Sequence, residues 1–74
     1  MRRPRVGDVY QIGAQRFEVT AWLWQPPAWR AIGVASGGGV PAVETQTLVA
    51  DLERARLMSG GMGEPCPEGD PTRC

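Results

Sequence analysis

The chain lacks histidine, and all eight of its basic residues are arginine, so it also lacks lysine. Histidine is the commonest general base in enzymes and lysine supplies the amine of Schiff-base catalysis, so two common catalytic groups are missing. Ser36 lies in Ala-Ser-Gly-Gly-Gly, which does not have the Gly-x-Ser-x-Gly spacing of a hydrolase nucleophile. No Lys-Ser/Thr pair follows these glycines, as a phosphate-binding loop would require. We therefore expect no enzymatic activity, no catalytic residue and no cofactor.

Cysteine is also scarce, because Cys66 and Cys74 are the only two. Without histidine or a Cys-x-x-Cys pair, the chain lacks the usual ligands of a zinc site, and we expect no bound metal. The two thiols can pair, but the composition favours unpaired thiols in a reducing compartment. No apolar run approaches the length of a membrane span, and the N-terminus lacks the apolar stretch of a secretory signal. These absences favour a cytoplasmic location without membrane contact.

Charge is balanced overall but unevenly distributed, with eight basic and eight acidic side chains along the 74 residues. Arg2, Arg3 and Arg5 make residues 1–5 a basic arm, which can contact phosphate groups or an acidic protein surface, or can simply be solvated. Residues 60–74 are rich in glycine and proline and contain little apolar content beyond Met62. That composition predicts an irregular tail without a fold of its own.

Most of the chain between the arm and the tail has the character of β-strands. Four segments show alternating apolar residues or β-branched and aromatic content, at residues 6–12, 16–24, 29–35 and 40–47. Turn-forming residues separate these segments, namely Gly13-Ala14, Pro26-Pro27 and Gly37-Gly38-Gly39. The spacing therefore predicts a run of short strands joined by tight turns.

The apolar period changes after Thr47, where Leu48, Leu52 and Ala55 recur at helical spacing. This spacing predicts one amphipathic helix over residues 48–58. Four or five short strands and one helix are too few for a two-layer α/β domain. They favour a mainly β fold, a small SH3-like barrel whose open end is capped by the helix. We predict one barrel domain over residues 6–59.

The aromatic residues are the strongest functional signal in the sequence. Strict alternation along residues 16–24 places four apolar residues on one face, namely Phe17, Val19, Ala21 and Leu23, and we expect Phe17 and Val19 to belong to the core. The same alternation turns Trp22 and Trp24 to the opposite, polar face. Trp29, across the Pro26-Pro27 turn, can join them. Exposed tryptophans are overrepresented at protein interfaces, so these three are candidate protein-binding residues. The alternative is structural, because both faces of a strongly bent strand can be covered in a small barrel.

The first predicted hairpin resembles one in the head–tail joining (attachment) proteins of tailed phages. The shared residues are Arg5-x-Gly7-Asp8-x-x-x-Ile12-Gly13-x-x-x-Phe17-x-Val19 and, further on, Gly39-Val40-Pro41-Ala42-Val43. The layout of strands followed by a leucine-rich helix is also similar to small SH3-like proteins of phages and mobile elements. The chain departs from the joining proteins in its C-terminal helix and in lacking their longer N-terminal portion. The resemblance implies a component of a virion or of its assembly.

We therefore expect a non-enzymatic domain that acts by protein–protein contact, either by self-association or within a larger assembly, in the host cytoplasm or the virion. One alternative is a small inhibitor of a host enzyme. Another is a nucleic-acid-binding barrel, in which the tryptophans stack on bases and arginines meet phosphates. The arginines in question are Arg2, Arg3, Arg5, Arg16 and Arg30.

Overall fold

A computed structural model describes residues 3–67 and shows a mainly β domain with five antiparallel strands and one short helix. The elements are β1 (Val9–Ile12), β2 (Gln15–Gln25), β3 (Ala28–Gly37), β4 (Val40–Leu48), α1 (Val49–Arg54) and β5 (Arg56–Ser59). The prediction of a mainly β class with one short helix is thereby confirmed. The sheet is open rather than closed, since its strand order β4-β3-β2-β1-β5 leaves β4 and β5 at the two edges.

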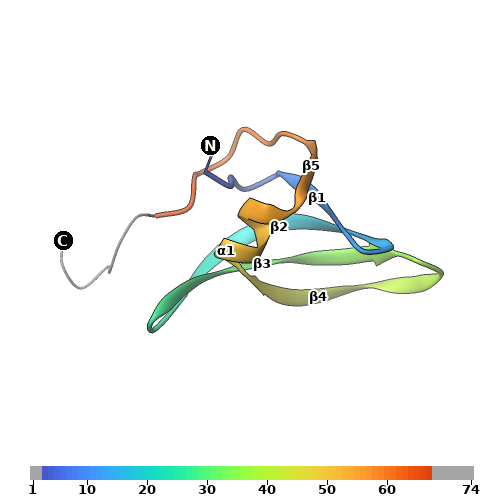
Figure 1. Cartoon of the computed structure of the whole chain (residues 1–74), viewed down its shortest axis with the longest axis horizontal. Helices are drawn as coiled ribbons and strands as arrows, with labels where there is room; N and C mark the ends of the chain where they lie inside the picture. The colour runs from blue at the N-terminus through green and yellow to red at the C-terminus, as the bar shows by residue number, and fades with distance from the viewer. Residues whose placement is uncertain (1–2, 68–74) are drawn as a thin grey trace.

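Tight turns connect the first four strands into a meander (Figure 1). Pro26 and Pro27 form the two-residue turn between β2 and β3, where their missing N–H groups leave no donor unpaired. Gly38 and Gly39 turn the chain from β3 into β4 with φ angles of 64° and 80°, which other residues adopt at a steric cost. The four strands predicted from the sequence are therefore the four strands of the meander.

The core lies on one face of this sheet, beneath α1, and we call this face the inner face. Its buried side chains come from three strands and the helix, namely Tyr10, Phe17, Val19, Ala31 and Leu52. Cross-strand pairing aligns Phe17 with Tyr10 on one side and with Ala35 on the other. The prediction that Phe17 and Val19 belong to the core is therefore confirmed.

A β-bulge in the middle of β2 corrects the predicted facing of the residues that follow it. Val19 pairs with Gly33 and Ala21 with Ile32, so Thr20 is an extra residue without a partner in β3. Its hydroxyl instead donates a hydrogen bond to the carbonyl oxygen of Ile32, at 3.1 Å. Beyond the bulge the alternation is reversed, so Leu23 leaves the inner face. Trp22 lies on the inner face instead, where strict alternation had placed its neighbours Ala21 and Leu23.

The helix is shorter than the sequence predicted. α1 ends at Arg54, and Arg56–Ser59 form β5 instead of continuing the helix to residue 58. The predicted anchor Leu52 is fully buried, whereas Leu48 ends β4 and is exposed. β5 forms because pairing with β1, which sets Leu57 opposite Tyr10, replaces the hydrogen bonds that a longer helix would have made. Within residues 3–67, no helix is long and apolar enough to cross a membrane.

The chain beyond β5 contains no regular strand or helix up to residue 67, and it packs against the beginning of the chain. Backbone hydrogen bonds join Val6 to Glu64, Gly63 to Val6 and Cys66 to Pro4, at 2.8–3.0 Å. Figure 1 shows the two segments running side by side. We call residues 4–8 and 61–66 together the terminal layer. Residues 68–74 lie outside the described part of the chain, and so does the question of a Cys66–Cys74 disulfide.

Asp8 holds the terminal layer to the sheet. This side chain is fully buried, and one of its oxygens accepts hydrogen bonds from the Tyr10 hydroxyl and the Arg5 backbone N–H, both at 2.9 Å. The other oxygen accepts one from the Gly61 N–H at 2.6 Å. A Cβ atom at Gly61 would lie 2.6 Å from the Asp8 nitrogen, so only glycine permits this approach. Glycine therefore serves here for close packing.

Candidate protein-binding surface

The three tryptophans predicted to form a binding face lie on the inner face of the sheet, on the same side as the core. Trp22 pairs with buried Ala31 and packs against the core cluster. Its indole N–H donates a hydrogen bond to the Glu64 carbonyl oxygen at 3.2 Å. Trp22 therefore fastens the terminal layer to β2, and the prediction that it lies opposite Phe17 is wrong. The cause is the bulge at Thr20, which alternation alone does not reveal.

Trp24 and Trp29 form a pair near the turn between β2 and β3. They are direct cross-strand partners, and their ring centroids are 5.4 Å apart with an interplanar angle of 53°. This tilted geometry is one that aromatic pairs favour. Both side chains are half-buried. They share the inner face with Trp22 but lie further along the hairpin, past the buried core residues. The pair therefore presents aromatic surface to solvent at one end of the domain.

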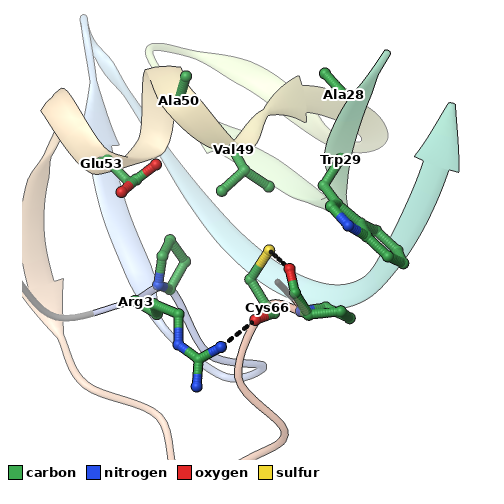
Figure 2. A pocket seen from close by; sticks show the side chains of 9 residues that line it. Arg3, Ala28, Trp29, Val49, Ala50, Glu53 and Cys66 are labelled. Atoms are coloured by element: carbon green, nitrogen blue, oxygen red, sulfur yellow. Dashed lines mark hydrogen bonds between the residues drawn. The ribbon is translucent and has the colours of Figure 1, made fainter. Parts of the chain in front are cut away.

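A cavity of about 350 Å³ opens beside Trp29, between the helix, the start of β3 and the terminal layer (Figure 2). Val49 and Cys66 face each other across it, and Arg3 and Glu53 add one charge of each sign. The other lining residues are Pro4, Ala28, Ala50 and Pro67. A cavity of this size lined mainly by apolar groups, with few polar ones, is typical of a binding pocket. Its volume suits one or two apolar side chains of a partner.

Two arginines of the predicted basic arm, Arg3 and Arg5, contact residues 63–66 of the terminal layer. Arg3 donates a hydrogen bond from its guanidinium to the Cys66 carbonyl oxygen at 3.1 Å, and Arg5 donates one to that of Gly63 at 3.3 Å. Arg2 lies outside the described residues. Arg16 and Arg30 pair with Ser36 and Leu23 on the face of β2 and β3 opposite the tryptophans. We call it the outer face.

The structure thus brings together Trp24, Trp29 and the cavity, while Trp22 has a structural position. No pattern in the sequence indicated the cavity, because two of its walls depend on the terminal layer and on the shortened helix. The excess of glycine and proline in residues 60–67 was consistent with either a tail or close backbone packing. The residue that joins these segments is Asp8, whose buried carboxylate accepts hydrogen bonds from three different segments. Its burial cannot be read from the sequence.

Comparison with models of protein families, with curated proteins and with solved structures found no match.

Proposed function

We propose that this domain is a non-enzymatic protein-interaction module that contributes to the assembly of a phage particle, in the manner of head–tail joining proteins. The assembly role rests on the resemblance of the first hairpin and of the Gly39–Val43 stretch to those proteins. The interaction role rests on one structural observation, the half-buried Trp24–Trp29 pair, of which Trp29 lines an apolar cavity.

The chemistry of this site favours a protein partner with a protruding apolar residue. Tryptophans at the edge of a pocket are typical interface hot spots, because they bury a large apolar area with little loss of side-chain freedom. The cavity beside Trp29 accepts an apolar side chain, and Arg3 and Glu53 can make polar contacts with the flanking residues. The nucleic-acid alternative has no comparable support, since Arg16 and Arg30 lie on the face opposite the tryptophan pair.

The test is recovery of the tagged full chain, after crosslinking, from cells of its native source. Three proteins are compared: the wild type, the double variant Trp24→Ser with Trp29→Ser, and the control Val34→Ser. Val34 is partly exposed on the outer face, so its replacement removes apolar surface away from the pair. We expect the wild type and the control to retain the same protein partner and the double variant to lose it.

Three outcomes decide between the functions. A partner that is a structural protein of a virus particle supports the assembly role. Material that is removed by nuclease, and whose recovery falls steeply with salt, supports nucleic-acid binding instead. Equal recovery of the same partner by all three proteins would show that the tryptophan pair is not the binding site. Thermal unfolding of each variant shows whether a loss reflects the site or the fold.

A further inference from the structure

The two edges of the sheet carry strands whose outer backbone groups have no sheet partner among the described residues. β4 pairs only with β3 and β5 pairs only with β1. All four residues of β5 are exposed, and so are all residues of β4 apart from Thr47. Edge strands are usually protected by short length, charge, proline or a covering segment. β4 has nine residues with a proline only near its start and one charged side chain, so its protection is weak.

One cross-strand row on the inner face shows that both edges expose apolar side chains continuous with the core. The row runs through all five strands in the order Val43, Ala35, Phe17, Tyr10 and Leu57. Its three central members are between 2% and 8% exposed, whereas Val43 is 56% exposed and Leu57 is 41% exposed. The apolar side chains at the centre of the row are therefore buried, whereas those at its two ends are exposed.

The charges of the two edge strands are complementary. Glu44 is the only charged residue of β4, and Arg56 is the only charged residue of β5. Both lie on the outer face, because Glu44 is aligned with Val34 and Arg56 with Gln11. All four neighbouring pairs of the sheet are antiparallel, so β4 and β5 run in the same direction and β5 of a second copy continues the sheet parallel to β4. With Leu57 beside Val43 on the inner face, Arg56 lies beside Ala42 on the outer face and diagonal to Glu44, a distance that two long side chains can span. Opposite charges on neighbouring strands stabilise pairing and like charges oppose it.

We propose that a second copy of this chain docks by pairing its β5 with β4, so that the sheet continues from one copy to the next. This proposal deepens the proposed function, on which it rests, by naming one partner of the interaction module. Pairing of β4 with β4 would place two Glu44 side chains on adjacent strands, and pairing of β5 with β5 would do the same with Arg56. The β4–β5 contact uses two different edges, so each copy can bind two others and form a ring or a filament.

The experiment measures the mass of the purified full chain by sedimentation over about a hundredfold range of concentration, which a mass-action equilibrium requires. We expect the wild type to associate as concentration rises. Glu44→Arg and Arg56→Glu should each weaken association about tenfold, by turning one attraction into a repulsion. A mixture of the two variants should associate again, because β4 of the Glu44→Arg variant then meets β5 of the Arg56→Glu variant with opposite charges restored.

Matched controls come from the same outer face. Glu18 aligns with Val34 and Arg16 with Gln11, so they lie in the same cross-strand rows as Glu44 and Arg56, but on the central strand β2. Glu18→Arg and Arg16→Glu should leave association within about twofold of the wild type, because neither residue lies at an edge. All four substituted side chains are exposed, and unfolding at low concentration checks that each fold is intact.

The remaining outcomes overturn the proposal or separate it from the proposed function. A monomer at every concentration would overturn it, and so would association that neither edge substitution weakens. Association that Arg56→Glu leaves unchanged, and that is strengthened by mixing the wild type with Glu44→Arg, would instead indicate β4–β4 pairing, because the mixture places opposite charges on the two β4 strands. The Trp24→Ser/Trp29→Ser variant should still self-associate. If the chain self-associates but has no tryptophan-dependent partner, the β4–β5 inference stands and the proposed binding site is wrong. If the chain is a monomer that still binds a tryptophan-dependent partner, the binding site stands and the β4–β5 inference is wrong.

Discussion

The terminal layer and β4 are two parts of the same domain with opposite relations between regularity and burial. The terminal layer contains no regular strand or helix apart from one isolated bridge between Arg5 and Pro65, yet Pro4, Asp8 and Cys66 within it are buried. β4 is a regular strand of nine residues with exposed side chains on both faces. Regular secondary structure and contribution to the core are therefore distinct properties in this protein.

The difference shows how a small domain completes its core. A short chain buries a limited share of its surface, so every segment that covers apolar groups matters. Here the terminal layer covers one side of the core and satisfies Asp8, Tyr10 and Trp22 through hydrogen bonds. β4 forms backbone hydrogen bonds with β3 along one side, but its side chains cover little of the core. We expect the terminal layer to determine stability and β4 to determine association.

The largest expected effect comes from removing half of the terminal layer. A chain that ends at Ser59 loses the bonds between residues 4–6 and 63–66, and it exposes the buried carboxylate of Asp8. We expect a loss of more than about 4 kcal/mol in unfolding free energy, which is most of the stability of a small domain. Denaturant unfolding measures this, with a chain ending at Pro67 as the control. A loss below about 0.5 kcal/mol would show that the layer covers nothing essential.

The second effect is at the centre of the five-strand row. Phe17 is buried between Tyr10 and Ala35, so Phe17→Ala leaves a cavity in the core and should cost about 3–5 kcal/mol. The measurement is the free energy of unfolding in denaturant. A cooperative transition with an unchanged midpoint would contradict the inner face as the structure defines it.

The strands of the meander were predictable from sequence, whereas the features that depend on distant segments were not. The turn at Pro26-Pro27 and the glycines after Ser36 fixed the strand ends to within two residues. Alternation failed at Thr20, because a bulge adds one residue without any local signal in composition. Periodicity failed after Arg54, since Arg56–Ser59 fit a helix equally well until β1 offers a partner. Of the three candidate tryptophans, the structure keeps Trp24 and Trp29 together and moves Trp22 into a structural position.

The third prediction concerns the hydrogen bonds of Asp8. Asp8→Ala leaves the Tyr10 hydroxyl and the N–H groups of Arg5 and Gly61 without their acceptor. We expect a loss of about 3 kcal/mol, since each buried unsatisfied donor costs about 1–3 kcal/mol and some regain water. Asp8→Asn keeps one acceptor oxygen and should lose less. If the two variants unfold at the same denaturant concentration, the hydrogen bonds are not what stabilises the terminal layer.

The smallest effect makes the sharpest comparison, because the same substitution is applied to a core strand and to the edge strand. Val19 in β2 is 1% exposed and Val43 in β4 is 56% exposed, and both lie on the inner face. Threonine has nearly the shape of valine, so the change adds a hydroxyl without creating a cavity. Val19→Thr buries that hydroxyl and should cost about 1–3 kcal/mol, whereas Val43→Thr leaves it in water and should change stability by less than about 0.5 kcal/mol. Both are measured by denaturant unfolding at a concentration low enough to keep the protein monomeric.

At high concentration Val43→Thr should weaken association while Val19→Thr should not, because only Val43 meets Leu57 of a second copy. Equal losses of stability in the two variants would mean that β4 is covered within a single chain, and the separate roles of the terminal layer and β4 would then have to be abandoned.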